Sequence, residues 1–149
     1  MTTKIAYTLE KQSPRSTRKN LIWVSPLAML VSTVANLGLY AAAGRLFPEV
    51  TAWPGAGVGQ IIGATIVYLL IGTMVFALIT RFSARPAHHF LIVSIVGLLL
   101  SLALPISAAF GANAPGTEPA TVATAVTLSL MHIVTFAISV PMFIRLALD

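Results

Sequence analysis

Long apolar runs separated by short polar segments dominate the hydrophobic pattern of this chain. Four stretches contain no Lys, Arg, Asp or Glu, at residues 20–44, 50–80, 86–117 and 119–144. Leu, Ile, Val, Ala, Phe and Gly make up most of each stretch. A helix of about 20 apolar residues crosses the ~30 Å hydrocarbon layer of a bilayer. Each stretch can therefore hold one transmembrane helix, and none is long enough to hold two helices and a turn.

The pattern predicts an all-α membrane protein, a four-helix transmembrane bundle with up-down-up-down topology. We place the spans at about 21–43, 55–80, 90–110 and 120–145, behind a basic tail at residues 1–20. Trp23 near the start of the first span fits the aromatic belt of a membrane interface. Pro105 should kink the third span, and Pro141 should kink or thin the fourth near its cytoplasmic end, because proline cannot donate the helical hydrogen bond.

Composition supports a membrane location and leaves no room for a second domain. Of the 149 residues 57% are hydrophobic and only 9% are charged, and the mean hydropathy is +0.91. Soluble domains have about 25% charged residues. The chain has no cysteine, which excludes disulfides, thiolate catalysis and cysteine metal sites.

The distribution of charge predicts the topology. All Lys and Arg except Arg45 lie in the tail, in the loop between spans two and three, or after span four. The positive-inside rule then places both termini in the cytoplasm. The pI of about 10.3 therefore reflects topology and attraction to anionic lipids. We expect membrane lipids and no nucleic acid among the partners.

The N-terminus also permits a second interpretation. A basic tail, an apolar run and the small residues 41–43 resemble a signal peptide with its cleavage site. The apolar run at 21–43 is longer than the usual segment of about 7–15 residues, which favours a retained span.

Three polar residues fall inside the predicted spans at similar depths, namely Asn36, Tyr68 and His132. Lipid offers such groups no hydrogen-bond partners, so they face protein or line a cavity. In one interpretation they hydrogen-bond across helices and stabilise packing. In the other they form a ligand-binding cluster, in which a neutral His132 carries protons, binds a haem or metal, or anchors a small molecule.

Rows of small and polar residues at helical spacing predict which helix faces are inward. The fourth span carries such a stripe at Thr121, Ala125, Ser129, His132, Thr135 and Ser139. The first span carries Ala28, Ser32, Asn36 and Tyr40 at a spacing of four. We expect both rows to face protein and the bulky residues to face lipid.

Gly55, Gly59 and Gly63 open the second span at a spacing of four. Such rows let two helices approach closely in lipid. They are helix-packing candidates, either against a neighbouring helix of the same chain or against a second molecule.

The sequence gives little indication of a catalytic site or a metal site. His88 and His89 are adjacent, so on a helix they point about 100° apart, and no further ligands lie nearby. We expect no metal and no cofactor. No Asp or Glu lies inside a span, which disfavours an ion-coupled transporter and leaves His132 without an acid to orient it.

These residues resemble a group of uncharacterised four-span bacterial membrane proteins, common in actinobacteria and known as a domain of unknown function. The resemblance covers about residues 20–147 and implies a bacterial inner-membrane location, without an activity. The matching marks are Leu21-Ile22-Trp23-Val24-Ser25-Pro26-Leu27, Ala35-Asn36, Arg81-Phe82, Leu130-Met131-His132 and Pro141.

Two functions remain open from the sequence, with a membrane enzyme as a third and weaker alternative. The first is a non-enzymatic scaffold or accessory subunit that associates with itself or with another membrane protein through its small-residue faces. The second is a bundle that binds or transports a lipid or small molecule at Asn36, Tyr68 and His132.

Overall fold

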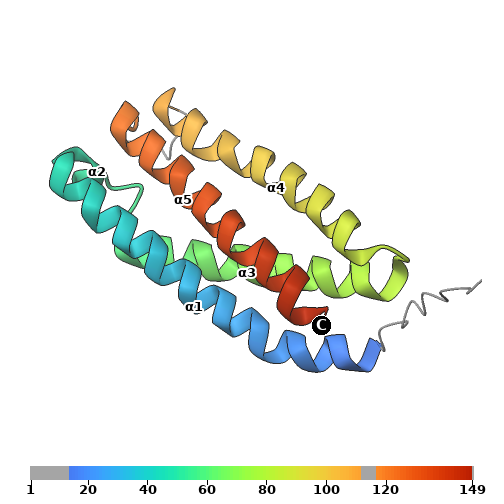
Figure 1. Ribbon diagram of the computed structural model, residues 1–149. Helices are drawn as coiled ribbons and strands as arrows, with labels where there is room; N and C mark the ends of the chain where they lie inside the picture. Colours follow the sequence, from blue (N-terminus) through green and yellow to red (C-terminus); the bar gives the residue numbers. More distant parts are fainter. Residues whose placement is uncertain (1–13, 112–116, 149) are drawn as a thin grey trace, which may run out of the picture.

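The computed structural model describes residues 14–111 and 117–148, and this part of the chain forms a bundle of four long helices (Figure 1). All four are long and apolar enough to cross a membrane. The predicted four-span, all-α fold is therefore confirmed, and the chain is a multi-pass membrane protein. The helices are α1 (Pro14–Leu46), α3 (Val58–Phe82), α4 (Pro86–Ala109) and α5 (Val122–Met142).

Several helix boundaries differ from the predicted ones. Helix α1 is already helical at Pro14, the first described residue, well before residue 21, because a helix can continue beyond the hydrocarbon. Helix α4 likewise begins with Pro86. Residues 1–13 of the predicted tail lie outside the described residues.

Two short helices were not predicted. Helix α2 (Pro48–Ala52) lies in the first loop, and the π-helical segment η1 (Phe143–Ala147) follows α5 directly. Pro141 lies just before η1. The backbone widens into a π-turn from two residues after Pro141, where we predicted a kink or a thinning of the helix. Helix α4 continues through Pro105 as an α-helix.

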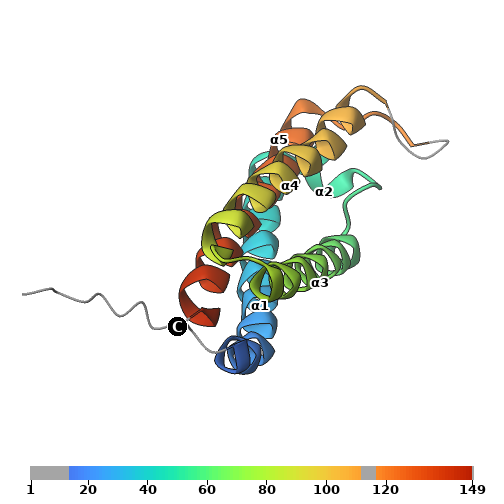
Figure 2. The same cartoon turned by 90° about the vertical axis from the view of Figure 1, so that its right-hand side faces the viewer.

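The four helices do not surround a common axis evenly. Helix α1 packs along both α3 and α5, and α5 packs along α4, whereas α3 and α4 contact each other much less. Figure 2 shows α3 and α4 joined at a turn and diverging away from it. Helix α3 is thus attached to the bundle mainly through α1.

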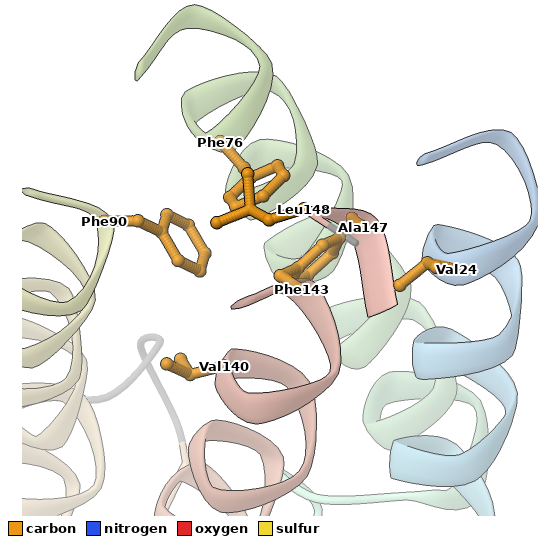
Figure 3. Close-up of a cluster of buried hydrophobic side chains, with 7 residues drawn as sticks. All are labelled: Val24, Phe76, Phe90, Val140, Phe143, Ala147 and Leu148. Atoms are coloured by element: carbon orange, nitrogen blue, oxygen red, sulfur yellow. The ribbon is translucent and has the colours of Figure 1, made fainter. Parts of the chain in front are cut away.

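A buried apolar cluster with three phenylalanine rings at its centre joins the four long helices and η1 near this turn (Figure 3). We call Phe76, Phe90 and Phe143 the aromatic cluster. Their ring centroids lie 4.8 to 5.7 Å apart, within the usual range for aromatic pairs. Val24 of α1 is buried against them. The cluster therefore closes the bundle at this end.

The opposite end is held by a second buried cluster near α2, which includes Tyr40, Val50 and Met131. The Tyr40 hydroxyl donates a hydrogen bond of 2.6 Å to the Ala56 carbonyl oxygen. This bond ties the loop before α3 to α1.

The outer surface of the spans is apolar. Val34, Met74 and Leu99, from three different helices, are each more than half exposed. Such a surface is stable in lipid, where exposed leucine and valine carry no penalty.

Charged side chains lie at the two ends of the bundle. We call the end that carries Lys19, Arg81, Arg85 and Arg145 the basic end; all four side chains are exposed. Both ends of the described chain lie there (Figure 1). The opposite, α2 end carries Arg45 in the last turn of α1, Glu49 in α2 and Glu118 before α5.

Candidate functional site

A cavity of about 620 Å³ lies between α3, α4 and α5, with Asn36 of α1 contributing to its lining. It occupies the side of the bundle where α3 and α4 contact each other least. Phe90 and Phe143 of the aromatic cluster line it, at the basic end. Its size lies within the range of about 300–1,000 Å³ that is typical of ligand sites.

Small side chains create this space. Ser94, Gly97 and Ser101 lie on one face of α4, and Ala64 and Gly72 lie on α3. A Cβ added at Gly97 would meet no atom within 4 Å. Because neither helix carries a bulky residue at these positions, the two helices leave the space between them unfilled.

The cavity is open along its side. Tyr68 and Ile71 of α3 and Leu100 of α4 line it and are 44%, 53% and 69% exposed. All three lie within the membrane spans. The opening therefore faces the hydrocarbon part of the bilayer.

Asn36 lies at the centre of the bundle and is 3% exposed. Its side-chain Nδ2 donates hydrogen bonds to Thr65 Oγ1 on α3 at 3.1 Å and to Thr135 Oγ1 on α5 at 2.9 Å. Asn36 thus connects three helices across the membrane interior. Its side-chain Oδ1 is buried and has no hydrogen-bond partner in the described residues.

Tyr68 and His132 contact each other at the wall of the cavity. Their ring centroids are 6.0 Å apart, and the rings meet edge to face at 67°. Within residues 14–111 and 117–148 neither the Tyr68 hydroxyl nor the His132 ring has a hydrogen-bond partner. Both side chains line the cavity, so their polar atoms are available to a bound molecule.

The structure brings the predicted residues Asn36, Tyr68 and His132 together around this one cavity. They meet because they lie at the same depth along their helices. Tyr68 and His132 each lie ten residues into their helices, about 15 Å from the α2 end. Asn36 lies ten residues before the end of α1, at the same depth.

Helix α4 contributes residues to the cavity that were not predicted. Ser94, Gly97 and Ser101 follow helical spacing of three and four, which could have indicated a small face on the third span. Thr65, which accepts a hydrogen bond from Asn36, was also missed. Nothing in its local pattern distinguishes Thr65 from the other threonines of the chain.

The three packing glycines occupy different environments. Gly55 precedes α3 and lies in a turn, where an added Cβ would overlap the Trp53 ring. It is therefore not on the same helix face as the others, contrary to our expectation. Gly59 and Gly63 are exposed, and an added Cβ would meet no atom within 4 Å at either position. They do not pack against another of the described helices, and packing against a second molecule stays a prediction.

The histidine pair lies at the start of α4. The ring centroids of His88 and His89 are 5.7 Å apart. His89 Nδ1 shares a hydrogen bond of 2.5 Å with Ser83 Oγ. The described residues contain no group of three His, Asp or Glu side chains that could hold a metal ion.

The chain belongs to the family of unknown function DUF6069, which matches residues 12–149. The expected membership of a family of uncharacterised proteins is thereby confirmed. No curated protein and no solved structure has significant similarity to the chain.

Proposed function

We propose that this member of the family binds a lipid or another small apolar molecule in the cavity between α3, α4 and α5. The observation that carries the proposal is the lateral opening of the cavity into the hydrocarbon region, with unpartnered polar groups at half depth. Ligand sites typically combine apolar walls with a few convergent polar groups. This cavity has both features, at Tyr68, His132 and Asn36.

The energetics of the bilayer support the proposal. Polar groups inside a membrane are costly unless a partner satisfies them. Asn36 Nδ2 has protein partners, whereas the Tyr68 hydroxyl and the His132 ring have none in the described residues. A purely structural role would require such bonds. A bound molecule supplies them.

Filling the cavity should abolish binding. Gly97→Trp places a large ring in the open space, whereas Gly38→Trp makes the same change on α1, outside the cavity and also without a close neighbour. Native mass spectrometry of protein extracted in mild detergent should detect a bound lipid or small molecule on the wild type and on Gly38→Trp. Gly97→Trp should lose it. Equal retention by both variants, or no bound molecule on the wild type, would contradict the proposal.

Self-association through α3, as a scaffold or accessory subunit, is a second candidate function. Its support is that Gly59 and Gly63 are exposed on the outer face of α3 with open space around them. Small residues at this spacing allow close contact between helices of two molecules in lipid. The partner would be a second copy of the chain or another membrane protein.

We also propose that the protein resides in a bacterial inner membrane with its basic end in the cytoplasm. The gathering of Lys19, Arg81, Arg85 and Arg145 at one end supports this orientation. The bacterial location follows from the resemblance noted in the sequence.

A further inference from the structure

The chemistry of the cavity narrows the class of ligand that it can take. The first constraint is charge. None of the described residues that line the cavity is Asp, Glu, Lys or Arg. A charged ligand group at this depth would lose its hydration without gaining an ion pair, which is strongly unfavourable. The group that reaches the polar residues is therefore uncharged.

The second constraint is hydrogen bonding. The Tyr68 hydroxyl can donate and accept, and a neutral His132 ring donates from one nitrogen and accepts at the other. Asn36 Oδ1 accepts only, but it is fully buried, so a molecule in the cavity does not reach it. Tyr68 and His132 therefore offer donors and acceptors together. A ligand group that only accepts, such as a ketone, an ester or an ether, leaves the acceptor nitrogen of His132 unpaired, whereas a hydroxyl both donates and accepts.

The third constraint is the apolar wall. Beyond the polar residues the lining is largely Ile, Val, Leu and Phe, and the opening faces the hydrocarbon region. A molecule that enters from the bilayer therefore carries an apolar body that remains in contact with lipid chains.

From these three constraints we infer that the ligand is an uncharged amphiphile with a hydroxyl head, bound at Tyr68 and His132 with its apolar body between α3 and α4. This inference rests on the proposed function and specifies its ligand class. A long-chain or isoprenoid alcohol and a neutral glyceride share this chemistry.

Matched probes separate the hydroxyl from the apolar body. Purified protein is titrated with oleyl alcohol, with methyl oleyl ether and with oleate at pH 8, and binding is measured by native mass spectrometry. The ether has the same chain and cannot donate. Because an unpaired buried acceptor weakens binding by about tenfold, the alcohol should bind about tenfold more tightly than the ether. Oleate should bind more weakly than the alcohol.

A second set of probes distinguishes the sources of the hydroxyl. Farnesol represents isoprenoid alcohols, and dioleoylglycerol, with its 3-acetyl derivative as the control, represents neutral glycerides. Tighter binding of farnesol than of dioleoylglycerol identifies the isoprenoid source. Preference for dioleoylglycerol over its acetyl derivative identifies the glyceride source.

A protein variant tests the same contact. Tyr68→Phe removes a hydroxyl that has no partner in the described residues, so it should leave the fold intact and reduce the preference for alcohol over ether. Tyr40→Phe removes a hydroxyl that is already bonded to Ala56 and should leave the preference unchanged.

The outcomes separate this inference from the proposed function. Equal binding of alcohol and ether, both lost in Gly97→Trp, would overturn the hydroxyl inference and leave the cavity as a general apolar site. Tighter binding of oleate would also overturn the inference. Failure of every probe to bind would overturn the proposed function as well.

Discussion

Asn36 is the residue on which the interior of the bundle most depends. Its amide nitrogen joins α1 to α3 and α5 through Thr65 and Thr135. Inside a membrane each such bond contributes about 0.6–2 kcal/mol. Because α3 contacts α4 so little, the bridge from Asn36 to Thr65 is a main polar attachment of α3.

Replacement of Asn36 by leucine should therefore destabilise the protein. The two bonds are lost and Thr65 and Thr135 lose their donor, so we expect a decrease of about 1–3 kcal/mol in the free energy of unfolding. The free energy of unfolding is measured by titrating dodecyl sulfate into mixed micelles that contain the protein.

The matched control is Val34→Leu, on the lipid-exposed face of the same helix. It should change stability by no more than about 0.5 kcal/mol. Equal stability of Asn36→Leu and the wild type would remove the structural role that we assign to this bridge.

For single residues, the sequence predicted which polar side chains lie inside the membrane but not which partners they bond to. Asn36, Tyr68 and His132 were found because polar residues are rare in apolar runs and each could be placed in depth by counting along its helix. Their hydrogen bonds could not be found, because partner choice depends on how helices rotate about their axes. Asn36 bonds to two threonines, while Tyr68 and His132 contact each other only through their rings.

At the scale of helices, the inward row of α1 was predicted well and the row of the fourth span only in part. Ala28, Ser32, Asn36 and Tyr40 are all buried, since a spacing of four keeps residues on one helix face. In the fourth-span row Ala125 and Ser139 are buried, the middle residues are half-buried and Thr121 is exposed. Helix ends were less predictable. The apolar runs define where a helix can lie in lipid, but they do not specify its first residue. Helix α1 is helical from Pro14, outside the first run, and α4 begins at Pro86, four residues before the predicted span.

The Gly55 error has the same origin. The spacing of four predicted that Gly55 lies on the same helix face as Gly59 and Gly63. In the structure Gly55 lies in the turn before α3, where an added Cβ would overlap the Trp53 ring. The open side between α3 and α4 was not predictable either, because local patterns do not specify which pairs of helices pack tightly.

The exposed face of α3 leads to a prediction about assembly. If Gly59 and Gly63 contact a second molecule, then Gly59→Leu and Gly63→Leu should each shift a dimer toward the monomer by about fivefold or more, because leucine keeps two backbones apart. Crosslinking in native membranes and native mass spectrometry measure the shift.

Gly38→Leu on α1 is the matched control, since Gly38 is also exposed and has no close neighbour. It should not affect association. A strict monomer in the wild type, with no co-purifying membrane protein, would reject the second candidate function and leave the cavity proposal untouched.

For the whole molecule, the basic end predicts orientation. Reporter fusions after Arg85 and after Leu148 should both report a cytoplasmic location, and a fusion after Ala52 in the α2 loop should report the opposite side. A shared location for Ala52 and Arg85 would contradict the topology, because α3 separates them.

The central claim about the whole molecule is a bundle that spans the bilayer with its cavity open to lipid. The chain has no cysteine, so single spin labels can be attached without a background. A label at Gly97→Cys in the cavity is compared with Leu99→Cys on the lipid face of α4 and Ala84→Cys in the exposed turn at the basic end.

Electron paramagnetic resonance in bilayers measures how often each spin label collides with oxygen, which concentrates in lipid, and with a water-soluble nickel complex. These two collision rates test the lipid-facing position of the cavity. The account predicts that the labels at positions 97 and 99 both collide with oxygen and not with nickel, and that oleyl alcohol reduces the oxygen collisions at position 97 alone. The label at position 84 should collide with nickel. Ready access of nickel to position 97 would mean a water-filled cavity and would contradict the account.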